Sequence, residues 1–145
     1  MKRFEFSLDP LLKIKQQFKQ QLEMRSAFLH RRLTEAGTRL KSLHRSLDGY
    51  RDELSGAITN ESETLQFMLQ RQSIELIIEQ MDRVREEMQD TNQDLQQVLG
   101  EIKEMSTEIE AIQLLRDDRV LEYKQDVKKH SLESLNELIL RQRSH

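Results

Sequence analysis

The chain has 145 residues, and its composition does not suit an ordinary globular core. Charged residues make up 34% of it, apolar residues 36% and aromatic residues 5%. Such a composition is typical either of a disordered chain or of long helices that bury only a narrow apolar stripe. The absence of Cys excludes a disulfide framework and a thiolate metal site. No secretory signal pattern is found, and no apolar run approaches the roughly 18 residues of a transmembrane helix, so a cytoplasmic location is predicted.

The charges are divided unevenly along the chain. Residues 1–51 carry 12 Lys/Arg and 5 Asp/Glu, whereas residues 52–145 carry 11 and 21. A basic half followed by an acidic half favours an arrangement in which the two halves lie against each other. A basic arm for nucleic acid is the alternative. That alternative leaves the acidic half unexplained, so we expect no nucleic-acid partner.

The chain opens with apolar residues in alternation, in the stretch KRFEFSLDPLL. Asp9 is predicted to cap the first turn of a helix, with Pro10 at the first helical position, where a missing N–H costs nothing. The F-x-F-x-L segment precedes this helix. Four states are open for it: folded back on an apolar face of the C-terminal helix, docked into a partner, paired as a short strand with a partner's edge, or disordered like many termini.

From Pro10 the pattern becomes helical, and a first helix is predicted over about 10–57. Steps of three and four join the apolar residues Leu33, Ala36, Leu40, Leu43, Leu47, Tyr50, Leu54 and Ala57. Upstream the pattern continues through Phe18, Leu22 and Leu29, with Arg25 at a position of the apolar seam. The phase slips between Leu29 and Leu40, which we interpret as a four-residue stutter.

The stretch SGAITNESET, residues 55–64, has turn-forming residues and no helical face, and it predicts a turn at about 58–63. A second helix is predicted over about 64–142. Its seam consists of Ile74, Ile77, Met81, Val84, Met88, Thr91, Leu95, Val98, Ile102, Met105, Ile109 and Ile112. This exceeds the three to four heptads that indicate a coiled coil. Past this seam the phase shifts, and the apolar face continues through Val120, Tyr123, Val127, Leu132, Leu135, Leu138 and Ile139.

Two apolar stripes joined by one turn predict an all-α fold: a long antiparallel two-helix coiled-coil hairpin, with the second helix longer than the first, in a single domain spanning 1–145. A homodimer that paired the basic halves would be repelled, which favours the hairpin. With the turn near residue 59, Asp9 would lie opposite residue 109. The chain after about residue 113 would then extend beyond its partner helix.

No pattern of catalytic or metal-binding residues is found. No two of the four histidines lie three or four residues apart on one face, and no Gly-rich loop precedes a Lys-Ser/Thr pair. We therefore predict a protein that is not an enzyme, with no catalytic residues, no metal and no cofactor. Met81, Met88 and Met105 fall on the seam and are interpreted as core, with a promiscuous Met-rich binding face as the alternative.

The chain resembles the FliJ family of flagellar type III export proteins. The resemblance rests on KRFEFSLDPLLKIKQQ at the start, GYRDEL at 49–54, and residues 109–142, a Leu-rich helix that contains Tyr123-Lys124. It implies a non-enzymatic coiled coil similar to the central stalk of rotary ATPases. Such a protein inserts the end carrying both termini into the pore of the hexameric flagellar export ATPase and promotes its assembly and activity. It also contacts the cytoplasmic domain of the export gate, with export chaperones as further partners, and reaches the inner membrane only through these partners.

The resemblance also implies which residues bind. The ATPase-binding set is Phe4, Phe6, Leu11, Lys13, Lys15, Arg116, Arg119 and Tyr123. The gate-binding set is Leu43, Tyr50, Ile74, Ile77 and Met81. Two other functions stay open: a general coiled-coil scaffold, and an export chaperone or holdase that uses an exposed apolar face.

Overall fold

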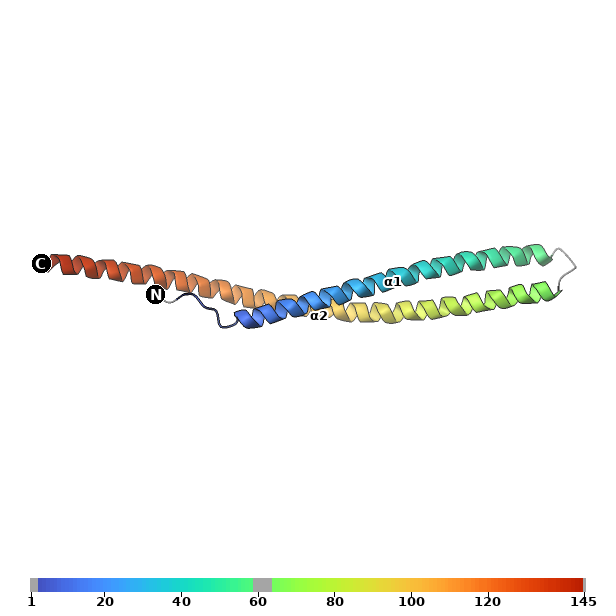
Figure 1. Cartoon of the computed structure of the whole chain (residues 1–145), viewed down its shortest axis with the longest axis horizontal. Helices are drawn as coiled ribbons and strands as arrows, with labels where there is room; N and C mark the ends of the chain where they lie inside the picture. The colour runs from blue at the N-terminus through green and yellow to red at the C-terminus, as the bar shows by residue number, and fades with distance from the viewer. Residues whose placement is uncertain (1–2, 59–63, 145) are drawn as a thin grey trace. The chain divides into compact units, whose positions relative to one another are not determined.

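The computed structural model describes residues 3–58 and 64–144, and these form two helices (Figure 1). Helix α1 spans Asp9–Ile58 and helix α2 spans Thr64–Arg143. The predicted all-α hairpin with a longer second helix is confirmed. Most of the predicted turn, at 59–63, lies outside the described residues.

The contacts divide the chain into two compact units, each built from one segment of α1 and one of α2. Unit 1 contains Met1–Gln21 and Glu101–His145, and unit 2 contains Leu22–Gly100. Within the described ranges, neither helix has a stretch apolar and uncharged enough to cross a membrane.

Unit 2 has its core between two antiparallel helical segments. Leu47 packs with Ile77 and Met81, and Met81 is only 2% exposed. Arg39, about two turns earlier on α1, pairs with Glu87, further along α2, so the segments run in opposite directions. The apolar seam predicted for this part of the chain is therefore the surface that the two segments bury.

Apart from Asp9 and Gly37, the covered positions of α1 follow a single heptad pattern without a slip. They are Leu12, Lys15, Lys19, Leu22, Ser26, Leu29, Leu33, Ala36, Leu40, Leu43, Leu47, Tyr50 and Leu54. The predicted stutter is therefore wrong. Phe18 is 46% exposed and Arg25 is exposed, whereas Lys19 and Ser26 occupy the seam. A lysine stem can cover apolar surface while its amine stays in water, so a seam position need not be apolar.

The covered positions of α2 match the predicted seam from Ile74 to Ile112, including the buried Thr91. The predicted change of phase is also present. After Ile112 the covered residues are Arg116, Val120, Tyr123 and Val127. From residue 128 to residue 144 every residue is exposed.

Unit 1 pairs the start of α1 with the second half of α2, again antiparallel. Lys15 Nζ donates to Glu108 at 2.6 Å, and Arg116 Nε donates to Asp9 at 3.0 Å. Asp9 therefore lies opposite residue 116 and not residue 109 as predicted. A heptad pattern repeats and so does not fix this register. The pairs Lys15–Glu108 and Asp9–Arg116 define it.

Within each unit, basic residues of α1 form ion pairs with acidic residues of α2, as the charge division in the sequence favours. Lys15–Glu108 in unit 1 joins a base on α1 to an acid on α2, and so do Arg39–Glu87 and Arg32–Glu87 in unit 2. The Arg116–Asp9 pair has the opposite polarity. Opposite charges that flank an apolar seam help to set which residues face each other.

Candidate partner-binding surfaces

The N-terminal segment, residues 3–8, lies along α2 in unit 1 (Figure 1). Its side chains alternate as an extended chain requires. Phe4, Phe6 and Leu8 are covered, whereas Arg3, Glu5 and Ser7 are exposed. Of the four states left open by the sequence, the structure shows the segment folded back on the C-terminal helix.

A short turn carries the segment into α1. Asp9 N donates to Phe6 O at 3.1 Å, and Leu12 N donates to Leu8 O at 2.8 Å. Leu8 therefore accepts the first helical hydrogen bond and is the N-cap, and Asp9 is the first helical residue. The helix starts one residue earlier than predicted. Pro10 still lies in the first turn, where its missing N–H leaves no bond unmade.

The segment is held by a group of side chains that we call the N-terminal clasp: Phe4, Phe6, Asp9, Arg116 and Tyr123. The Phe4 ring lies 5.5 Å from the Tyr123 ring at an interplanar angle of 53°, and the Arg116 guanidinium lies 5.6 Å from the Phe4 centroid. Phe6 is 8% exposed. Arg116 and Tyr123 are two turns apart on one face of α2, so a single extended segment can contact both.

The clasp is a weak attachment in energetic terms. Burying one Phe side chain contributes about 1.5–3 kcal/mol, and an exposed cation–π contact adds about 0.5–1 kcal/mol. Fixing the backbone of each ordered residue costs about 1–2 kcal/mol. For six residues this cost, about 6–12 kcal/mol, is no smaller than the contribution of two Phe side chains and one cation–π contact, about 3.5–7 kcal/mol. Opening of the clasp is therefore thermally accessible without unfolding of the helices.

A cleft of about 320 Å³ lies beside the clasp, between the N-terminal segment and α2. Arg119 and Glu122 line it from α2 together with Tyr123, and Glu5 lines it from the segment. This cleft is open and mixed in polarity. It suits a polar or charged contact more than the enclosure of a small apolar ligand.

The residues expected to bind an ATPase all belong to unit 1. Phe4, Phe6, Arg116 and Tyr123 meet in the clasp, and Arg119 lines the adjoining cleft. Three others lie on the first turns of α1. Leu11 and Lys13 are exposed, whereas Lys15 is partly covered and bound to Glu108. Phe6 reaches a partner only if the clasp opens.

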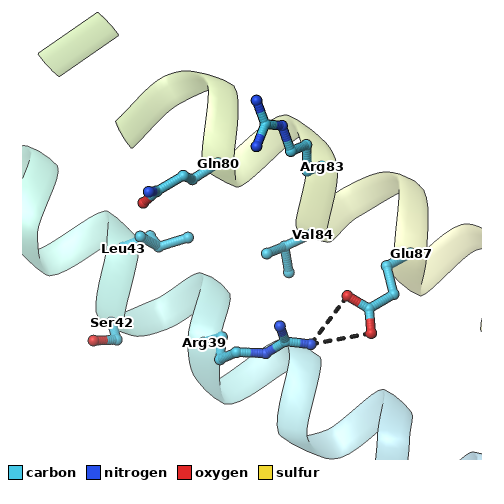
Figure 2. Close-up of a pocket in the computed structure, with 7 residues that line it drawn as sticks. All are labelled: Arg39, Ser42, Leu43, Gln80, Arg83, Val84 and Glu87. Atoms are coloured by element: carbon cyan, nitrogen blue, oxygen red, sulfur yellow. Dashed lines mark hydrogen bonds and ion pairs between the residues drawn. The ribbon is translucent and has the colours of Figure 1, made fainter. Parts of the chain in front are cut away.

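A second concave surface lies in unit 2 (Figure 2), with a volume of about 380 Å³. Leu43 of α1 and Val84 of α2 point toward each other and form its floor. One end is closed by Arg39, whose Nη2 donates to both carboxylate oxygens of Glu87, at 3.1 and 3.0 Å. We call this surface the unit 2 groove. It combines an apolar floor with charged walls.

The residues expected to bind an export gate all belong to unit 2 and are mostly core. Ile77 and Met81 are buried with Leu47, and Leu43, Tyr50 and Ile74 pack against them. Ile77 is 9% exposed. Leu43 also lines the unit 2 groove, and Tyr50 is partly covered. Leu43 and Tyr50 therefore present more surface to a partner than the buried pair does.

Sequence patterns missed several residues of these surfaces. Arg39 and Glu87 lie beside the seam on different helices, and only the register brings them together. Asp9 was identified for its place at the helix start, but its bond to Arg116 was not predicted. The charges contained a signal for this pair. Asp9 is an acid in the basic half of the chain and Arg116 is a base in the acidic half, so the two exceptions to the charge division complement each other.

Comparison with known proteins identifies the family of this chain. The family model described as the flagellar FliJ protein matches residues 4–142, from the first clasp residue almost to the end of α2. No curated protein and no solved structure matched the chain. Because the match covers nearly the whole chain, this two-helix protein, with its N-terminal segment folded back on α2, belongs to the FliJ family of flagellar export apparatus components.

Proposed function

We propose that this chain is a non-enzymatic, stalk-like component of the flagellar type III export apparatus. In this proposal unit 1 binds in the pore of the hexameric export ATPase and promotes its assembly and activity. Unit 2 contacts the cytoplasmic domain of the export gate, and export chaperones are further partners. The protein reaches the inner membrane through these partners.

One observation supports the ATPase contact most directly. All eight residues that the family resemblance assigns to it belong to one unit, although 101 residues separate Lys15 from Arg116 in the sequence. Lys13 and Arg119 are exposed there, and Leu11 adds an exposed apolar side chain. Exposed basic side chains with apolar neighbours can pair with acidic groups in the lining of a protein pore, where complementary charge guides association.

The test is the hydrolysis rate of the flagellar export ATPase with and without the full-length chain. The charge-reversal pair Lys13→Glu and Arg119→Glu should abolish stimulation, because both residues are exposed and the fold does not depend on them. Lys41→Glu, an exposed charge reversal in unit 2, is the matched control and should keep it. A full-length chain that changes neither the rate nor ring assembly would remove the ATPase proposal in favour of a scaffold or a chaperone.

The gate contact has its own test. Leu43 and Leu33 are both partly covered leucines on the α1 seam, but only Leu43 lines the unit 2 groove. Leu43→Ala should weaken binding to the isolated cytoplasmic domain of the gate by at least tenfold, whereas Leu33→Ala should have little effect. Equal losses in the two variants would indicate that general loosening of the hairpin, and not the groove, is responsible.

A further inference from the structure

The N-terminal segment shows what kind of ligand one face of α2 accepts. We propose that the α2 face from Arg116 to Val127 is a docking site for an extended partner segment in which aromatic or apolar residues alternate and a carboxylate follows. The resident occupant is the stretch from Phe4 to Asp9 of this chain; the partner segment displaces Phe4 and Phe6 and competes with Asp9 for Arg116. The proposal does not depend on which protein of the export apparatus supplies that segment.

The recognition chemistry follows from the contacts of the resident segment. The first ring, Phe4, contacts both the Arg116 guanidinium and the Tyr123 ring. The second ring, Phe6, is buried. A guanidinium and an aromatic ring placed two helical turns apart select for an aromatic residue, because both attract the faces and edges of rings.

The carboxylate requirement comes from the same arginine. Arg116 donates to Asp9 while it contacts Phe4, so one side chain binds both the ring and the carboxylate that follows it in the sequence. Both ion-pair partners are about half exposed, at 41% and 45%. An incoming carboxylate can therefore reach the guanidinium from solvent.

Two features of its backbone hydrogen bonds make the resident segment displaceable. Within residues 3–58 and 64–144, no backbone hydrogen bond joins the segment to α2. Its backbone bonds run instead to the start of α1, from Asp9 N to Phe6 O and from Leu12 N to Leu8 O. Release of residues 3–6 would therefore break one turn bond and leave the first helical bond intact.

The surface under the segment continues beyond it. Val120, Tyr123 and Val127 are partly covered, and Leu138, about three helical turns beyond Val127 on the same face of α2, is exposed. The resident segment runs antiparallel to α2, with Phe4 beside Tyr123 and Asp9 beside Arg116. Residues 3–8 leave Leu138 of α2 exposed. A partner segment with residues upstream of its first ring would cover this additional apolar surface, which gives it an advantage over the resident.

A peptide in trans tests the site. A fluorescent peptide with the sequence KRFEFSLD, residues 2–9, is titrated into the full-length chain and into the full-length double variant Phe4→Ser/Phe6→Ser, with anisotropy as readout. The double variant should bind the peptide at least tenfold more tightly than the native chain, whose tethered segment competes at high effective concentration. A peptide in which both Phe are Ser should not bind.

Substitutions in α2 show which face of this helix binds the peptide. In the double-variant background, Tyr123→Ala and Arg116→Ala should each reduce peptide affinity at least fivefold. Leu121→Ala, an exposed residue on another face of the helix, is the control and should leave affinity unchanged. Far-UV circular dichroism verifies that helix content is kept; if the double variant loses helix, Phe4→Ser alone replaces it as the receiving chain.

Three results would overturn the proposal. The first is equal affinity of the peptide for the native chain and the double variant, which would place binding elsewhere. The second is absence of binding to either chain. The third is a concentration-dependent dimer of the native chain, seen by light scattering and lost in the double variant, which would mean that the segments are exchanged between copies and do not occupy their own chain.

Discussion

Arg116 of α2 donates from Nε to a carboxylate oxygen of Asp9 at 3.0 Å, and this bond joins the first residue of α1 to the middle of α2's second half. The same guanidinium lies over the Phe4 ring. One side chain therefore holds both the start of the helix and the segment that precedes it. Its two contacts can be separated by mutation.

We predict that Asp9→Asn lowers the free energy of unfolding by less than about 1 kcal/mol, because the pair is about half exposed and screened by water. Arg116→Ala should cost more, since it also removes the cation–π contact with Phe4. Urea unfolding followed by circular dichroism measures both. If the two variants were equally stable, the contact between Arg116 and Phe4 would contribute nothing.

The core of unit 2 should be much more sensitive than its surface. Met81 is 2% exposed, so Met81→Ala should lower the free energy of unfolding by about 2–5 kcal/mol through lost transfer energy and a residual cavity. Met68 is 63% exposed on the same helix. Met68→Ala should change stability by no more than about 0.5 kcal/mol, and similar losses in both would contradict the assignment of Met81 to the core.

The sequence predicts the α2 seam well because apolar residues fill it almost without interruption, from Ile74 to Ile112. The start of α1 is different. There the seam contains Lys15, Lys19 and Ser26, and an apolar pattern alone moves the predicted seam onto Phe18. Polar side chains at seam positions carry no hydropathy signal, so only the paired structure shows which residues are covered.

The sequence also could not predict the register of the two helices or the position of the N-terminal segment. A heptad pattern repeats, so it does not fix which turn of one helix faces which turn of the other. The contacts between the helices define the register, and in unit 1 they pair Asp9 with Arg116 and not with residue 109. The folded-back segment was one of four open states because an F-x-F-x-L alternation is equally suited to α2 and to a partner.

The groove of unit 2 offers an electrostatic prediction. Glu87 accepts from Arg39 and lies 3.6 Å from Arg32, whereas its neighbour Glu86 is exposed. Glu87→Gln should lower the free energy of unfolding by up to about 1 kcal/mol at low salt, with the loss shrinking at high salt as the charges are screened. Glu86→Gln is the matched control. A loss that does not depend on salt would mean that Glu87 acts through packing and not through charge.

Gln70 offers a stabilising substitution. Its Oε1 is buried with no hydrogen-bond partner among the described residues, and Gln70 lies between Phe67 and Ile74 on the covered side of α2. A buried acceptor that makes no hydrogen bond carries a desolvation cost of about 1–3 kcal/mol. Gln70→Leu, similar in size and apolar, should therefore raise the free energy of unfolding by about 1 kcal/mol in urea titrations. A loss of stability would show that the amide is satisfied in solution.

The end of α2 should be the least protected part of either helix. Residues 128–144 are all exposed, whereas Ile109 and the residues around it pack against α1. Because most helical stability in proteins comes from packing, backbone amides at 128–143 should exchange with deuterium at least about a hundredfold faster than those at 102–112. Peptide-resolved hydrogen exchange measures this on the full chain. Equal protection in the two segments would mean that the apolar residues Leu132, Leu135 and Ile139 are covered in solution, and dilution would then show whether a second copy covers them, since protection by a copy decreases with concentration.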